Sequence, residues 1–238
     1  MIHRYSGIDT AQRCLQKYKI EYIDGERQQG ETPIALAFGT GLHSALQACL
    51  ENEDPLLVFN TYWDSFKYDN YEYRELAKAG PEFLRKFIKG HKKNLTPIHL
   101  EQRMSAIIGG KPWEGTADFL GLYKGVPAVI DYKTSAYNYP VEKILSNPQM
   151  PLYAEMAKQA LGFEAQKIVY LVFNKRETSI QVLETELTPE LSQRALETAQ
   201  QVAQDLDNRK VWPRNSASCI MGKHVCPWFQ KCYGGESL

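Results

Sequence analysis

The sequence of 238 residues contains no run of about 18 consecutive apolar residues, so it predicts no membrane-spanning helix. Its opening stretch, MIHRYSGIDTAQRC, lacks the apolar segment of a secretory signal. A P-loop, internal repeats and low-complexity segments are absent as well. We therefore expect a soluble cytoplasmic protein with no membrane partner.

The chain has no net charge, because 28 basic residues balance 28 acidic ones. Proteins that bind nucleic acid are often basic overall, so this balance counts mildly against that class. Charge acts mainly within one Debye length, about 8 to 10 Å, and the local cluster RKFIKGHKK spans residues 85–93. The cluster fits a solvated helix end as well as a patch that contacts DNA.

Disulfide bonds are not expected, because the five cysteines are odd in number and no signal sequence precedes them. Three of them lie near the end of the chain. Together with an early cysteine they supply four thiolates that can hold an iron–sulfur cluster or a structural zinc ion, namely Cys14, Cys219, Cys226 and Cys232. His224 is a substitute ligand, and unrelated free thiols are the alternative. Cys49 falls at helical spacing with Leu42 and Leu46, which favours buried packing.

The order of elements predicts an α/β fold with a mixed central sheet flanked by helices. Residues 1–95 are mainly helical in pattern, including a helix over 71–89. Residues 96–187 form the core, with strands at 99–108, 115–123, 126–135, 167–175 and 178–187 and a helix over 148–161. Residues 188–238 hold a long helix, with Thr188 as its N-cap, and an irregular cysteine-rich flap. We interpret the chain as one domain, 1–238, with the helical N-terminal part as an elaboration.

A hairpin at the centre of the chain carries the most informative charges. Asp131 and Lys133 are two residues apart on one strand, so their side chains share a face. If Lys124-Gly125 is a two-residue turn, Tyr123 pairs with Val126 and Asp118 lies opposite Asp131. Facing carboxylates repel unless something compensates, and hard oxygen ligands select Mg²⁺ or Mn²⁺ rather than Zn²⁺. Taken alone, an Asp-Tyr-Lys triplet is more often an ordinary surface strand.

These motifs resemble the RecB-like branch of the PD-(D/E)XK nuclease superfamily. GTADFLG is followed by DYKTS and then by NPQMPLYA, while FGTGLHSAL is similar to the upstream His motif of that branch. Cys14 is similar to the early cysteine of its iron–sulfur members. The resemblance runs from about residue 6 to residue 232, with the motifs in the correct order, and it implies a restriction-endonuclease-like core.

The resemblance also implies roles for single residues. Asp118, Asp131 and His43 are expected to bind the catalytic metal, and Lys133 to position the attacking water and stabilise charge on the phosphate. Gln149 and Tyr153 fit the Gln-x-x-x-Tyr motif, whose spacing puts both on one helix face. Glu101 is a further candidate carboxylate. The one early and three late cysteines imply a [4Fe–4S] cluster, although the gap between Cys219 and Cys226 is longer than usual.

The sequence thus predicts a metal-dependent DNA nuclease, an exonuclease that acts on single-stranded or duplex ends. DNA recombination, repair, phage replication and CRISPR adaptation are the processes that the resemblance implies, with a helicase, recombinase or CRISPR adaptation partner. Two alternatives remain open. One is a catalytically silent DNA-binding scaffold, which the intact Asp118, Asp131 and Lys133 disfavour. The other is a structure-specific endonuclease on the same fold.

Overall fold

The computed structural model describes residues 1–27, 32–221 and 224–234. These residues divide into two compact units, unit 1 (Met1–Glu31, Ile107–Glu114 and Glu197–Leu238) and unit 2 (Thr32–Ala106 and Gly115–Leu196). Whether they behave as the one domain that we expect stays a prediction. No helix in the described part of the chain has the length and apolar character that a membrane crossing needs.

Unit 2 is built on a mixed five-stranded sheet with the order β1-β2-β3-β4-β5. The strands are β1 (Leu95–Ile108), β2 (Lys111–Tyr123), β3 (Val126–Ser135), β4 (Lys167–Asn174) and β5 (Ser179–Glu186). β3 and β4 run parallel, whereas β2–β3 and β4–β5 are antiparallel. The parallel pair is joined through α6 (Glu142–Ser146) and α7 (Gln149–Leu161), which fits the long connection that parallel strands require.

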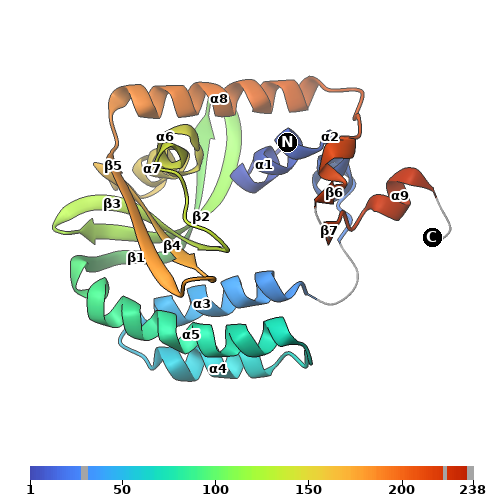
Figure 1. Ribbon diagram of the computed structural model, residues 1–238. Coiled ribbons are helices and arrows are strands. Elements are labelled where there is room, and N and C mark those ends of the chain that lie inside the picture. The colour runs from blue at the N-terminus through green and yellow to red at the C-terminus, as the bar shows by residue number, and fades with distance from the viewer. Residues whose placement is uncertain (28–31, 222–223, 235–238) are drawn as a thin grey trace. The chain divides into compact units, whose positions relative to one another are not determined.

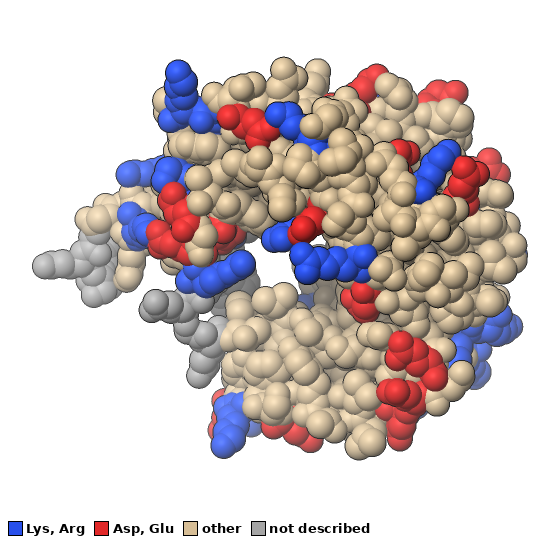
Figure 2. Space-filling view, turned by 180° about the vertical axis from the view of Figure 1, so that it is seen from behind, with Lys and Arg blue, Asp and Glu red and all other residues tan. Residues whose placement is uncertain are grey.

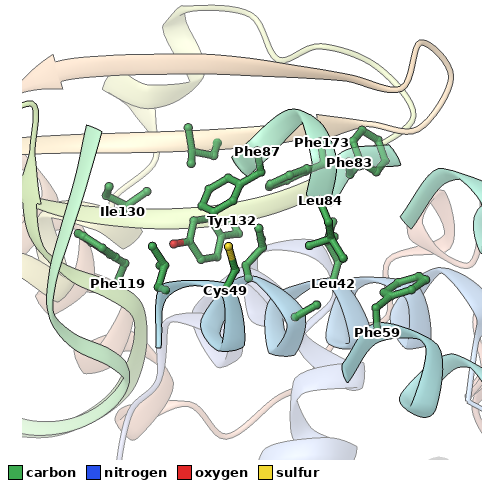
Figure 3. Close-up of a cluster of buried hydrophobic side chains, with 14 of the residues drawn as sticks. Leu42, Cys49, Phe59, Phe83, Leu84, Phe87, Phe119, Ile130, Tyr132 and Phe173 are labelled. Atoms are coloured by element: carbon green, nitrogen blue, oxygen red, sulfur yellow. The ribbon is translucent and has the colours of Figure 1, made fainter. Parts of the chain in front are cut away.

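Helices cover both faces of the sheet. In Figure 1, α3 (Ile34–Leu50), α4 (Pro55–Asp64) and α5 (Tyr71–Gly90) lie below the sheet, and α6 and α7 lie above it. The main apolar core fills the space between α3–α5 and one sheet face. Figure 3 shows Phe83, Phe87, Tyr132 and Phe173 meeting there, and Cys49 lies in the same cluster at 2% exposure. The predicted mixed sheet flanked by helices is confirmed.

Local sequence explains where the helices begin and end. Asp54 caps α4 by accepting hydrogen bonds from the Leu56 and Leu57 N–H groups, and Asn70 caps α5 in the same way. The hydroxyl of Thr188 accepts from the Leu191 N–H at the start of α8 (Pro189–Asn208), as predicted. α7 ends at Gly162, whose positive φ of 68° closes the last turn.

One strand boundary was predicted wrongly. The sequence suggested that GGKPW separates the first two strands, but only Gly109 and Gly110 form the turn, and Lys111 to Trp113 already belong to β2. Both glycines have positive φ, so they alone provide the reversal. Pro112 lies inside the strand, and its carbonyl accepts a hydrogen bond from the His3 N–H.

Unit 1 joins the two ends of the described chain. It contains α1 (Tyr5–Arg13), α2 (Leu15–Tyr18), the π-helical turn Lys19–Ile23, the 3-10 turn Ser216–Ser218, β6 (Ile220–Met221), β7 (His224–Val225) and α9 (Phe229–Tyr233), with parts of β1, β2 and α8. Ala11, Tyr18 and Leu206 form its small core. The tail that we expected to be irregular therefore has short elements, because β6 and β7 pair with each other.

We expect Gly80→Ala to destabilise the protein by about 1–3 kcal/mol, because a new methyl group would overpack the core. A Cβ at Gly80 would lie 2.0 Å from Cζ of the fully buried Phe59. The overlap outweighs the gain of about 1 kcal/mol in helix propensity. Urea unfolding measures the effect. Gly90→Ala in the same helix is the matched control, since its Cβ would meet nothing within 4 Å, and an equal loss there would contradict the overpacking argument.

Candidate active site

The β2–β3 hairpin has the predicted register. Tyr123 pairs with Val126, and the pairing continues to Phe119 and Ile130. Both turn residues, Lys124 and Gly125, have positive φ (52° and 82°), as a type I′ turn requires. Asp118 and Asp131 follow directly on the last pair, so they come next to each other on one face of the sheet.

Asp131 is the centre of a buried polar group. It is only 3% exposed, and its carboxylate lies 2.8–2.9 Å from Lys133 Nζ. Gln149 Nε2, from the first turn of α7, donates to Asp131 Oδ1 at 3.0 Å. Asp131 Oδ2 is buried and accepts no hydrogen bond of good geometry from the described residues, although Lys133 is near. The Lys133 ammonium, 2.8 Å away, is the charged partner of that oxygen.

Asp118 lies beside the hydrogen-bonding edge of β3. Its Oδ2 accepts a hydrogen bond from the Tyr132 N–H at 2.7 Å. The paired residues of β2 and β3 end at Phe119 and Ile130, so beyond them this side-chain oxygen takes the position that a backbone carbonyl would have in a continued ladder. His43 on α3 approaches the same oxygen, with 3.6 Å between Nδ1 and Oδ2. The His43 ring packs edge-on against the ring of Tyr132, which fixes its direction.

Glu101 reaches the same place from β1. One ligand atom each of His43, Glu101 and Asp118 lie within 4.8 Å of one another. Glu101 has a φ of 45°, a conformation that L residues rarely adopt inside a strand and that is typical of a β-bulge. From Met104 onward the buried side chains of β1 are at even-numbered positions, whereas Leu95 is buried at an odd-numbered one. The alternation of buried and exposed side chains therefore shifts by one residue between Leu95 and Met104. This local strain aims the carboxylate at the site.

Tyr153 completes the group of predicted residues. It lies one helical turn after Gln149 on α7, is 9% exposed, and interacts electrostatically with Asp131 and Lys133. Gly115 gives its ring room, since a Cβ there would lie 2.8 Å from Tyr153 Cε1. The structure thus brings together all seven residues that the sequence singled out for this site.

Three carboxylates, one imidazole and one lysine ammonium lie close together, and they shift one another's pKa values. Burial and the neighbouring Asp131 raise the pKa of Asp118 well above its usual range, against the opposing hydrogen bond from Tyr132. Burial and Asp131 raise the pKa of Glu101 too. Burial lowers the pKa of His43, which leaves its ring neutral and able to bind a metal. For Lys133, burial is outweighed by Asp131, which raises its pKa and keeps it charged.

Sequence reasoning missed two features of the site. The first is the Tyr132 N–H, which orients Asp118, and a backbone group leaves no mark in a sequence. The second is Asn147, whose side chain accepts from the Gln149 N–H and so holds the start of α7. Here a signal existed, because Asn-Pro is typical of a helix start.

The four predicted cluster cysteines also gather, within unit 1. Burial and then Cys226, Cys14 and Cys219 raise the pKa of the Cys232 thiol, so these three thiols are electrostatic neighbours of Cys232. Asn215 Nδ2 and Ser218 Oγ donate to the Arg13 carbonyl at 2.7 and 2.9 Å, and these bonds fix the tail beside Cys14. The side chain of His224, the substitute ligand, lies outside the described residues.

The basic segment 85–93 is largely engaged in local contacts. Arg85 pairs with Glu82 at 3.3 Å, Lys86 donates to the Thr178 carbonyl at 2.6 Å, and Lys92 donates to the Cys49 carbonyl at 2.7 Å. On the face shown in Figure 2, basic and acidic side chains are interspersed and do not form one large basic patch. The geometry therefore favours the solvated helix end for this segment.

Comparison with known proteins decides the family. The model of the PD-(D/E)XK nuclease superfamily matches residues 5–233, nearly the whole chain. The chain belongs to the PD-(D/E)XK nuclease superfamily. None of the curated proteins matches it. As members of this superfamily require, an acidic residue, Asp118, precedes the Asp131-x-Lys133 pair on the next strand of the hairpin.

One solved structure shares the fold of this chain. The chain is similar to the crystal structure of a "Putative exonuclease" from Eubacterium rectale, at 17% identity and a TM-score of 0.62, over 99% of this chain and 94% of that one. At this identity the likeness shows the fold alone. A second crystal structure, SSO0001, matches at 18% identity over 86% of this chain and 89% of its own, and its TM-score of 0.35 carries no argument.

Proposed function

We propose that this chain is a Mg²⁺- or Mn²⁺-dependent deoxyribonuclease that hydrolyses phosphodiester bonds at DNA ends. One observation carries the proposal. His43, Glu101 and Asp118 offer ligand atoms within 4.8 Å of one another, beside the Asp131–Lys133 ion pair. Three carboxylates, a neutral imidazole and a charged lysine at one place suit metal-assisted hydrolysis of a phosphate ester.

The residues present fit a divalent cation. Carboxylate oxygens are hard ligands of the kind that Mg²⁺ and Mn²⁺ prefer, and one imidazole is compatible with Mn²⁺. The raised pKa of Asp118 indicates that this carboxylate is short of positive partners, and a cation bound beside it would supply the missing charge. We assign His43, Asp118 and Asp131 as ligands, with Glu101 as a further one. Bound there, the cation would lower the pKa of a water molecule and neutralise charge on the phosphate.

The remaining residues have separate tasks. Lys133, with a side chain 31% exposed, can direct its ammonium group at the scissile phosphate and stabilise the charge that develops there. Gln149 holds Asp131 in place through its amide, and Tyr153 closes the same side of the site. No covalent enzyme nucleophile is needed for this hydrolysis, because water attacks directly.

Cleavage should depend on added Mg²⁺ or Mn²⁺, stop in EDTA and receive little support from Ca²⁺. Calcium takes more ligands at longer distances, so it can occupy the carboxylates without the correct water geometry. An end-labelled DNA substrate incubated with each ion measures this. Full hydrolysis in chelator without added metal would contradict the proposed metal site.

Exonuclease action is the finer part of the proposal. It rests on the resemblance to the RecB-like branch and on the name given to the Eubacterium rectale protein. Linear and covalently closed circular DNA, each single-stranded and duplex, distinguish the modes, because an exonuclease degrades only the linear forms. Cleavage of closed circles would favour the endonuclease alternative. Binding without any cleavage in either metal would favour the silent scaffold.

We further propose that Cys14, Cys219, Cys226 and Cys232 bind one [4Fe–4S] cluster with a structural role. The resemblance to iron–sulfur members of the RecB-like branch and the placing of Cys14, Cys219 and Cys226 near Cys232 support the proposal, and Cys₄ sets hold such clusters or zinc. Recombination, repair, phage replication and CRISPR adaptation remain the proposed settings, with a helicase, recombinase or adaptation protein as partner.

A further inference from the structure

A large aromatic side chain is exposed just beyond the strand that carries Asp131 and Lys133. Tyr137 is 64% exposed and lies in the loop of residues 136–140 that follows β3. Tyr137 lies four positions after Lys133, so their Cα atoms lie within about 14 Å. The distance from this loop to the site is therefore one that a few nucleotides of a DNA strand can span.

This loop is held rigidly, although it is exposed. Asn174, buried to 2% exposure at the end of β4, donates from Nδ2 to Asn138 Oδ1 at 3.0 Å. The Gln181 side chain accepts from the Tyr139 N–H at 2.8 Å and donates to the Tyr139 carbonyl at 2.9 Å. The Tyr137 N–H donates to Ser135 Oγ at 3.2 Å. Tyr137 is thus presented to solvent on a fixed backbone.

A cation accompanies the exposed ring. The Arg176 guanidinium lies 4.8 Å from the Tyr137 ring centroid. Asn174 Oδ1 accepts the Arg176 N–H at 3.0 Å, so one buried amide positions both the loop of Tyr137 and the turn of Arg176. Nearby, Lys143 Nζ lies 5.0 Å from the centroid of the Tyr139 ring. Aromatic and basic groups therefore alternate along this edge of unit 2.

Such a combination is the one that binds single-stranded nucleic acid, where bases stack on aromatic rings and cations accompany the phosphates. The buried Asn174 amide fixes Asn138, the direct neighbour of Tyr137, and this suggests that the position of the exposed ring matters, because the ring itself adds little to the core. We propose that Tyr137, backed by Arg176, is a stacking platform for an unpaired base of the DNA strand that enters the site. This inference rests on the proposed nuclease function and specifies a single-stranded end as the substrate.

Fluorescence anisotropy in EDTA tests it, with a labelled oligo(dT) of about 12 nucleotides, a length within the usual range of such sites. Tyr137→Ala should weaken binding by about tenfold, the loss typical of one stacked base. Tyr137→Phe and Tyr137→Trp should stay within about twofold of the unaltered protein, because they keep the ring. Tyr71→Ala is the matched control, since Tyr71 is a 73% exposed tyrosine on α5, and it should bind normally.

An oligonucleotide with abasic sites isolates the base. Tyr137→Ala and the unaltered protein should bind this oligonucleotide alike, because nothing is left to stack. Equal affinity of Tyr137→Ala and the unaltered protein for oligo(dT) would overturn the inference while leaving the nuclease proposal intact. An equal loss in Tyr137→Phe, or a loss that persists on the abasic strand, would overturn it as well. If the unaltered protein neither binds nor cleaves DNA, both proposals fail.

Discussion

We expect Lys133→Ala to lower the cleavage rate by about a thousandfold or more, because in the proposed mechanism it removes the charge that stabilises the transition state, a loss that typically costs several kcal/mol. Asp131→Asn has a similar effect, since it replaces a metal-binding carboxylate by a neutral amide of the same shape. Single-turnover cleavage of end-labelled DNA with saturating metal measures both rates. Asp131→Asn keeps an oxygen that can accept the hydrogen bond from Gln149 Nε2, but both variants break the Asp131–Lys133 ion pair and are expected to lose some stability, so folding is checked for each.

A lysine on the neighbouring strand provides the control for this prediction. Lys167 on β4 pairs with Glu184 at 3.8 Å and its side chain is 21% exposed, against 31% for Lys133. Lys167→Ala therefore removes a comparable strand lysine and leaves the rate unchanged. Circular dichroism establishes that each variant is folded at the assay temperature. Near-normal activity in folded Lys133→Ala or Asp131→Asn would remove both residues from the active site.

If the proposed cluster is present, we expect Cys14→Ser to abolish iron binding and to destabilise the protein by about 2–5 kcal/mol, the range for removal of a native disulfide cross-link. A cluster held by Cys14 and the three late cysteines closes a loop of about 200 residues, which restricts the unfolded chain. Protein purified anaerobically is expected to be brown, with about four iron atoms per chain. Iron analysis, the visible spectrum and thermal unfolding follow the loss.

Cys49→Ala is the matched variant for the cluster. Cys49 is 2% exposed in the core of unit 2 and belongs to a different unit from the four cluster cysteines, so its replacement keeps the iron and the colour. If protein prepared anaerobically with ample iron contains zinc and no iron, the [4Fe–4S] proposal is wrong and the structural zinc ion is the correct alternative. Four free thiols with no bound metal would contradict both.

Much of the sheet could be predicted from the sequence. Side chains along a strand point to alternate faces of the sheet, and a two-residue turn allows only one pairing register between its two strands. Lys124-Gly125 was therefore enough to place Asp118 next to Asp131. Apolar runs ending in charge marked β3, and the spacing of Gln149 and Tyr153 put both on one face of α7. These are local relations, and local spacing determines them.

Only the tertiary structure decided which distant segments complete the site. The sequence pattern of β1 does not predict that the Glu101 side chain points toward the site. Its direction comes from a positive φ, which changes the alternation of buried and exposed side chains along the strand. His43 meets Asp118 only because α3 packs on the sheet, and the Tyr132 N–H is available to Asp118 only where the pairing ends. Asn174 lies 36 residues after Asn138, and no local rule connects them. The sequence by itself determined the hairpin and its charges, since neighbours along the chain are constrained by covalent geometry, while contacts between distant segments depend on how whole elements pack.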